Sequence, residues 1–144
     1  MDVSELRKGI LRALDAARQE ASTRRQVRDD AGAAFARFLE QVVTPMMRQA
    51  AEVLRAERHD FTVQTPGGSA RLASDRSGQD FIEIELDASA APPAVIGRTS
   101  VARGRRGVVV EERPIAPGKS IGEITEQDVA DFLLSEIQRL VTKP

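Results

Sequence analysis

Apolar residues recur at helical spacing in two stretches of the first third of the chain. One stretch covers residues 3–17 and the other covers residues 34–54, with almost nothing apolar between residues 18 and 30. Positions three and four apart share one face of an α-helix, so each stretch predicts an amphipathic helix. The polar run either continues the first helix in solvent or connects it to the second.

The bounds of these two helices follow from the same pattern. We place the first helix from residue 3 to about residue 26, with Ser4 as its N-cap, and the second from residue 31 to residue 58. Pro45 falls inside the second helix, where a proline removes one backbone hydrogen bond and clashes with the preceding turn. Because the apolar spacing continues past Pro45, we favour one kinked helix. The alternative is two consecutive helices, with Thr44 as N-cap and Pro45 at the first helical position.

The first helix carries a narrow apolar stripe on an otherwise charged surface. The stripe consists of Leu6, Ile10, Leu14 and Ala17. A stripe of this width is typical of a coiled-coil-like contact rather than of a fully buried helix. We therefore expect these four residues to mediate self-association into a homodimer, by pairing two stripes or by laying one stripe on a partner's body.

The periodicity changes from helical to alternating after residue 60. Residues 81–87 alternate strictly between apolar and polar and are the clearest predicted strand. The other predicted strands are residues 61–65, 70–74, 95–102 and 108–113. Short connections rich in glycine, proline and serine separate them, and such connections join antiparallel neighbours. The pattern predicts an antiparallel, meander-like sheet of about five strands.

The last predicted element is a helix from residue 126 to about residue 141. Thr125 is its expected N-cap, and Asp128 occupies the place of the capping-box acid. The order α-α-β-β-β-β-β-α predicts an α+β fold in which helices cover one face of the sheet. We expect an N-terminal helical arm, residues 1–30, and a single α+β domain, residues 31–144.

Composition excludes several classes of protein and site. The chain has 144 residues and a net charge of -1, which gives no overall field for nucleic acid or an anionic membrane. It has no cysteine, so disulfides and thiolate metal sites are excluded. No run of about 18 apolar residues is present, so we expect no membrane-spanning helix. The first residues resemble no signal peptide, and we expect a cytoplasmic location.

Three carboxylates alternate along the clearest predicted strand, and they are Glu83, Glu85 and Asp87. Alternate residues project from one face of a strand, and three acids on one face suit a hard cation or an acid–base pair. We favour a simpler interpretation, in which this face is solvated and its acids pair with arginines on neighbouring strands. Those arginines are Arg71, Arg98 and Arg113.

The only basic cluster surrounds the hairpin between the last two predicted strands, and it comprises Arg98, Arg103, Arg105 and Arg106. Arginine side chains fit phosphate groups, and a basic hairpin can enter a nucleic-acid groove. However, the chain has neither tyrosine nor tryptophan to stack on bases. A solvated hairpin tip is the simpler interpretation, and phosphate or nucleic-acid contact is the alternative.

No catalytic set is recognisable in the sequence. The one histidine, His59, falls at the end of the second predicted helix, and a single histidine is too few for a metal site. We predict a non-enzymatic interaction or assembly module without a cofactor, whose partner is a second copy or another protein. One alternative is a small-molecule-binding module with a pocket between the sheet and the kinked helix, near Pro45 and Met46. Another is a nucleic-acid-binding accessory protein that uses the arginine hairpin.

Overall fold

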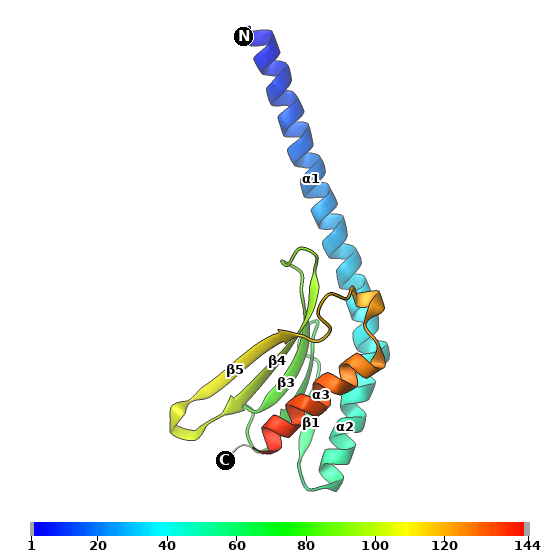
Figure 1. Cartoon of the computed structure of the whole chain (residues 1–144), viewed down its shortest axis with the longest axis vertical. Coiled ribbons are helices and arrows are strands. Elements are labelled where there is room, and N and C mark those ends of the chain that lie inside the picture. The colour runs from blue at the N-terminus through cyan, green and yellow to red at the C-terminus, as the bar shows by residue number, and fades with distance from the viewer. Residues whose placement is uncertain (1, 143–144) are drawn as a thin grey trace.

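A five-stranded antiparallel sheet carries helices on one face, and a long helix extends from this body (Figure 1). The computed structural model describes residues 2–142. The helices are α1 (Val3–Phe38), α2 (Thr44–Ala56) and α3 (Glu126–Val141). The strands are β1 (Phe61–Gln64), β2 (Ala70–Ser74), β3 (Phe81–Asp87), β4 (Ala94–Ala102) and β5 (Val108–Pro114). The predicted α+β class and the order of the elements are confirmed.

The sheet is a meander in which each strand pairs with the next along the chain. Its order is β1-β2-β3-β4-β5, and all four pairs are antiparallel. The register places Glu83 opposite Arg71 on β2 and Arg98 on β4, and it places Glu112 opposite Arg98. Opposite charges therefore face one another across three consecutive strand pairs.

The core lies between the sheet and the helices. Alternate strand residues supply one side of it, because only every second side chain points toward the helices. The buried side chains on that side include Leu72, Ile82, Ile84, Val95 and Val101. The helices supply the other side with Val43, Met47, Ala51, Leu54, Val129, Phe132 and Leu133.

The polar run continues the first helix, which was one of the two alternatives, so the predicted end of that helix near residue 26 is wrong. Helix α1 continues for 36 residues without interruption, so the polar run 18–30 is helical. Arginine is the commonest residue in this run, which also contains glutamine, glutamate and alanine, and all four residue types favour helix in solvent as well as in a core. The predicted cap is also wrong, because Asp2 rather than Ser4 caps the helix, accepting from the backbone N–H groups of Ser4 and Glu5.

Helix α1, a π-helical turn (Leu39–Val43) and helix α2 follow one another without a break and form one helical rod, residues 3–56. The π-helical turn lies just before Pro45. The backbone N–H of Thr44 donates to the carbonyl of Leu39, five residues earlier. This wider turn lies where the proline ring would clash with a regular α-helical turn. Thr44 has helical backbone angles and does not cap α2 with its side chain. The favoured interpretation of a helix that continues past Pro45 is therefore closer to the structure than a new N-cap.

Helix α3 begins as predicted. Thr125 accepts from the backbone N–H of Asp128 at 3.1 Å, and Asp128 accepts from the backbone N–H of Thr125 at 2.9 Å. This capping box satisfies two backbone donors that a helix end would otherwise leave open. Lys119 adds an ion pair of 2.8 Å to the Asp128 carboxylate, which ties the preceding loop to the start of α3.

Candidate interaction surface

The arm, which we define as residues 3–30 of α1, is exposed along almost its whole length. Every residue from 2 to 20 is exposed, and Figure 1 shows this half of the helix standing clear of the body. At 1.5 Å per residue the arm is about 40 Å long. A helix without tertiary contacts is only marginally stable in water, so contact with another surface would stabilise it.

The apolar stripe, Leu6, Ile10, Leu14 and Ala17, lies on one face of the arm. Its members are three or four residues apart, so the helix brings all four predicted residues into one row. Leu6 and Ile10 are each 51% exposed and Leu14 is 45% exposed. Large apolar side chains exposed in a continuous row mark a surface for contact with another apolar surface.

Toward the body, the side chains on this face of α1 change from exposed apolar to basic and then to buried aromatic. Arg24 and Arg28 take the place of apolar residues and line a shallow groove of about 200 Å³ with the loop 88–93. Phe35 and Phe38 follow and are buried in the core. The helix is therefore anchored at its C-terminal end, while its N-terminal end carries the exposed stripe.

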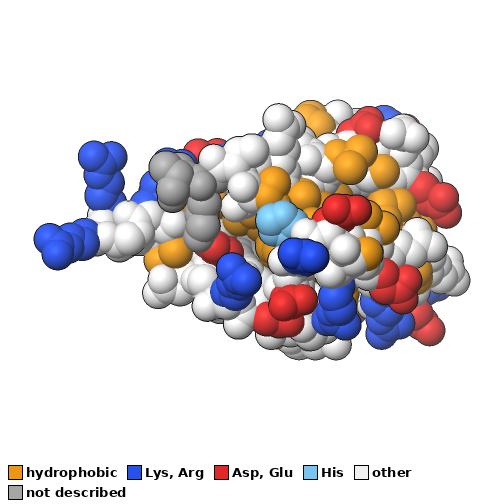
Figure 2. Space-filling view, turned by 90° about the horizontal axis from the view of Figure 1, so that it is seen from below, with side chains coloured by type: hydrophobic (Ala, Val, Ile, Leu, Met, Phe, Trp, Pro, Cys, Tyr) orange, Lys and Arg blue, Asp and Glu red, His pale blue; other side chains and the backbone are white. Residues whose placement is uncertain are grey.

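A second apolar surface, the α2–α3 groove, lies between the two helices for which it is named. It has a volume of about 330 Å³, and its lining includes Met46, Ala50, Val53, Leu133, Leu134 and Ile137. Its rims, Val53 and Leu134, are 65% and 66% exposed, whereas Leu133 on its floor is buried. The view in Figure 2, from the end of the body opposite the arm tip, shows apolar side chains reaching the surface among charged ones.

Sequence reasoning missed this groove. Met46 lines the groove, while its neighbour Met47 is fully buried. The consecutive residues Phe132, Leu133 and Leu134 were the available signal, because three neighbouring positions span about 200° of the helix, which is wider than a typical core-facing stripe. The sequence does not show that α2 lies beside Leu134, because tertiary packing alone determines which helix is its neighbour.

The basic cluster divides into two parts. Arg103, Arg105 and Arg106 are exposed at the tip of the β4–β5 hairpin, which the chain turns with a short 3-10 helix at Gly104–Arg106. In Figure 2 basic side chains stand out at the far left, where Figure 1 places this hairpin. Arg98 lies further along β4 and is held in ion pairs, so the structure does not bring it to the hairpin tip.

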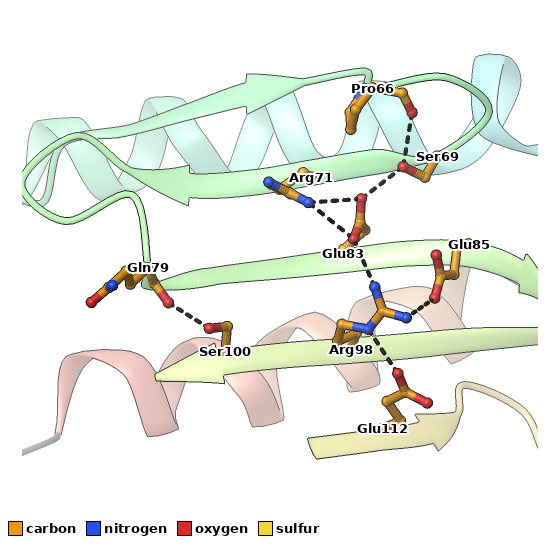
Figure 3. Close-up of polar contacts among 9 residues, drawn as sticks. All are labelled: Pro66, Ser69, Arg71, Gln79, Glu83, Glu85, Arg98, Ser100 and Glu112. Atoms are coloured by element: carbon orange, nitrogen blue, oxygen red, sulfur yellow. Dashed lines mark hydrogen bonds and ion pairs between the residues drawn. The ribbon is translucent and has the colours of Figure 1, made fainter. Parts of the chain in front are cut away.

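The acidic strand face is a network of ion pairs rather than a solvated surface (Figure 3). Glu83 is only 4% exposed, so the expectation that this face is solvated is wrong for Glu83, whereas its expected pairing with Arg71 and Arg98 is confirmed. Its carboxylate accepts from the Ser69 hydroxyl at 2.8 Å and from Arg71 Nη2 at 3.3 Å, and it lies 3.5 Å from Arg98 Nη1. Burial of this carboxylate requires such partners, because an unpaired buried charge is very costly.

Arg98 connects this network across the sheet. Its guanidinium donates to Glu85 at 2.5 Å and to Glu112 at 2.8 Å as well as facing Glu83. The prediction that Arg113 pairs with the acidic face is wrong, because Arg113 lies on the opposite face. There its guanidinium stands 4.6 Å from the ring centre of Phe132.

The electrostatics of this face agree with a structural role. The hydrogen bond from Arg98 to Glu112 raises the pKa of the Arg98 guanidinium, and Glu85 and Glu83 act in the same direction. Hydrogen bonds from the Ser89 hydroxyl and backbone N–H lower the pKa of the half-buried Asp87 carboxyl. Within residues 2–142, no group of three acidic or histidine side chains is arranged to hold a metal ion.

A depression of about 640 Å³ separates the helical rod from the sheet. Its lining includes Phe35, Leu39, Thr44, Arg48, Ser69 and Leu86. It lies between the sheet and the π-helical turn, which is where a small-molecule pocket was expected, but beside Thr44 and not beside Met46. Polar side chains lie on both sides of it, and they are Glu40, Thr44 and Arg48 on the helical side and Thr65 and Ser69 on the side of the sheet.

The comparisons with known proteins add no further identification. No protein-family model, no curated protein and no solved structure matches the chain. None of the helices in the described part of the chain is both long and apolar enough to span a membrane.

Proposed function

We propose that this protein is a non-enzymatic interaction or assembly module that associates with a second copy of itself through the arm. The single observation that carries this proposal is the exposed stripe of Leu6, Ile10 and Leu14 on a helix whose other end is fixed in the core. The helix presents such a row to a partner, and contact with that partner would in turn stabilise the arm. The pathway in which the assembly acts would be set by further protein partners in the cytoplasm.

Burial of the stripe would supply the driving force for association. Apolar surface removed from water contributes about 25 cal/mol per Å², and only the surplus over the cost of association remains as affinity. Two identical chains most often associate with two-fold symmetry, in which each stripe is covered once. A homodimer is therefore the expected assembly.

The polar residues of the body support this assignment over a catalytic one. Glu83 and Arg98 neutralise each other within a network that already occupies their hydrogen-bonding atoms. Groups held in this way stabilise the sheet and are poorly placed to exchange protons with a substrate.

The test replaces two residues of the stripe. The variant Leu6→Glu/Ile10→Glu should be a folded monomer in sedimentation equilibrium, because two carboxylates cannot be buried in an apolar contact. The matched control, Gln19→Glu/Ser22→Glu, adds the same charge to exposed positions on the opposite side of the same helix and should remain dimeric. Circular dichroism checks that both variants fold. A dimeric Leu6→Glu/Ile10→Glu variant would show that the stripe is not the contact.

A second candidate function, small-molecule binding, is supported by the depression beside Thr44. Its volume of about 640 Å³ lies in the range of known ligand pockets. Native mass spectrometry of gently purified protein should then reveal a bound compound. A Thr65→Trp variant, which places a large ring at the exposed edge of this lining, should lose it. If the unmodified protein carries no compound and binds none from a metabolite library, this second candidate is wrong.

A further inference from the structure

The α2–α3 groove is an apolar surface that the rest of the chain, as described over residues 2–142, leaves open. Its lining is apolar except for Gln49, and its two most exposed rims, Val53 and Leu134, stand on opposite sides of a buried floor. A helix laid between the rims would cover both of them at once. Recognition of this kind uses anchors three, four and seven residues apart on the incoming helix.

The arm of the same chain cannot reach this groove. Helix α1 is one uninterrupted α-helix, and Phe35 and Phe38 fix its base in the core. Figure 1 shows the arm leaving the body in the direction opposite to that in which α2 continues from the rod. To fold back, α1 would have to break in the middle, so any arm that occupies the groove must belong to another chain.

The lengths of the two parts of the rod match each other. Residues 3–30 form the arm, and residues 31–56 form the part of the rod that belongs to the body. At 1.5 Å per residue each part is about 40 Å long. Two copies placed side by side and antiparallel would therefore set each arm against the body of the other copy, with neither arm extending far beyond it.

The apolar stripe of the arm and the row of apolar residues along the α2 side of the groove also match in length. Leu6 and Leu14 are about 12 Å apart along the helix axis at 1.5 Å per residue, and Met46 and Val53 are about 10 Å apart by the same measure. In both rows, successive apolar residues are three or four positions apart along the chain, which is the spacing that lets side chains of two helices interdigitate. The stripe thus fits the groove in length and in spacing.

The charges around the two surfaces have opposite signs. Between residues 3 and 17 the basic side chains, Arg7, Lys8 and Arg12, outnumber the acidic ones by one. In α2 and α3 together, the two helices that form the groove, five acidic residues outnumber the three basic ones by two. Opposite signs of this kind favour the approach of the arm to the groove and disfavour the approach of two like-charged arms to each other.

We propose that the arm of a second copy lies in the α2–α3 groove, with Leu6, Ile10 and Leu14 between Val53 and Leu134. The exchange is reciprocal, so one two-fold axis relates both contacts and the assembly closes as a dimer. This inference rests on the proposed function, self-association through the arm, and adds the surface that receives the arm. In place of a stripe-to-stripe pair, each stripe has a partner surface on the other body.

Engineered cysteines test the proposal directly, because the natural chain has none. Single variants Ile10→Cys and Leu134→Cys are purified separately, incubated together to exchange subunits, and oxidised with a copper–phenanthroline catalyst. Mass spectrometry should find a disulfide-linked peptide that joins position 10 of one chain to position 134 of the other, and Ile10→Cys alone should give no linked dimer. The control Gln19→Cys, on the opposite face of the arm, should not link to Leu134→Cys. Efficient linkage of Ile10→Cys to itself, with none to Leu134→Cys, would overturn the proposal.

A charge variant in the groove separates this inference from the proposed function. Leu134→Glu should halve the mass of the assembly as Leu6→Glu/Ile10→Glu does, and its fold should survive because Leu134 is 66% exposed. The control Ser135→Glu, on the exposed side of α3, should remain dimeric. If Leu134→Glu stays dimeric while the arm variant becomes a monomer, the groove is not the receptor, but self-association through the arm stands. If the unmodified chain is a monomer, both proposals are wrong.

Discussion

Phe132 on α3 lies directly over Gly97 on β4, and its ring occupies the space that a side chain at position 97 would need. Phe132 is 2% exposed, so its ring is enclosed by its neighbours, among them the Arg113 guanidinium, and has little room to move away. The absence of a side chain at Gly97 is therefore what allows α3 to approach the middle of the sheet. This contact fixes the distance between the last helix and the strands beneath it.

Gly97→Ala is expected to destabilise the fold. The new methyl group would displace the Phe132 ring, and overpacking of a filled core costs about 1–3 kcal/mol. Chemical denaturation measures the loss in free energy of unfolding. The control Gly122→Ala, where a methyl group meets nothing within 4 Å, should change stability by less than about 0.5 kcal/mol. Adding Phe132→Leu to Gly97→Ala should recover part of the loss, and a double variant less stable than both single variants would contradict this account.

Asp128 is expected to make stability depend on pH in the acidic range. The ion pair with Lys119 and the hydrogen bond from the Thr125 backbone lower the pKa of the Asp128 carboxyl below its ordinary value of about 3.9. The charged form is thus favoured in the folded state. Its contribution is complete above the unfolded pKa and disappears as the pH falls through the lower, folded pKa.

Asp128→Asn should therefore lower the melting temperature at pH 7 and make progressively less difference below about pH 4. Thermal melts of both proteins from about pH 7 to about pH 2 measure this convergence. Asp29→Asn, on the exposed arm, is the control and should differ little from the unmodified protein at every pH. A deficit of Asp128→Asn that grows as the pH falls would contradict the assigned ion pair.

The arginines of the hairpin tip are expected to be dispensable for stability. Changing Arg103, Arg105 and Arg106 to serine should alter the free energy of unfolding by less than about 0.5 kcal/mol, because all three side chains are exposed. Arg98→Ser is the contrasting variant, since it removes the partner of Glu83, Glu85 and Glu112, and it should be clearly destabilising. If the two variants lowered the free energy of unfolding equally, the division of the basic cluster into an exposed hairpin tip and an ion-paired Arg98 would be wrong.

The same triple variant also tests the nucleic-acid hypothesis. A protein that binds phosphates through this hairpin would be retained on heparin in a salt-dependent way, and the triple variant would elute at lower salt. Self-association through the arm predicts weak retention of the unmodified protein and no shift for the variant.

The strands and α3 were predictable because local signals defined them. Strict alternation in residues 81–87 indicates a half-buried strand, and the capping box of Thr125 and Asp128 marks a helix start. The continuity of α1 was not predictable in this way, since apolar periodicity reports which helix faces are buried and not whether a solvated run is helical. An exposed run such as residues 18–30 has no such periodicity even when it is fully helical.

Sequence reasoning found the stripe and the arginine partners of Glu83, but it missed the burial of the Glu83 carboxylate and the α2–α3 groove. Glu83 alternates with buried residues just as a solvated side chain would, and its burial follows from the side chains of Arg71 and Arg98 on neighbouring strands. The groove depends on how closely α2 and α3 approach each other over the sheet. Contacts of that kind depend on tertiary packing, which a single sequence does not encode in any local pattern.

The arm is expected to be the first helix to open in a monomer. Its residues 3–17 are all exposed, whereas α3 buries Val129, Phe132 and Leu133 in the core. Hydrogen exchange of the Leu6→Glu/Ile10→Glu variant should show amides 3–17 exchanging well before those of α3. In the unmodified protein, association should slow the exchange of the arm. Equal protection of the arm and α3 in a monomer would mean that the arm folds onto its own body.

The mass of the unmodified protein in solution tests self-association through the arm most directly. Multi-angle light scattering at tens of micromolar protein gives this mass without assumptions about shape, which matters for a chain with so long an arm. A dimer predicts a mass of twice 15.7 kDa, and Leu6→Glu/Ile10→Glu should reduce it to 15.7 kDa. A mass of 15.7 kDa for the unmodified protein would contradict the account.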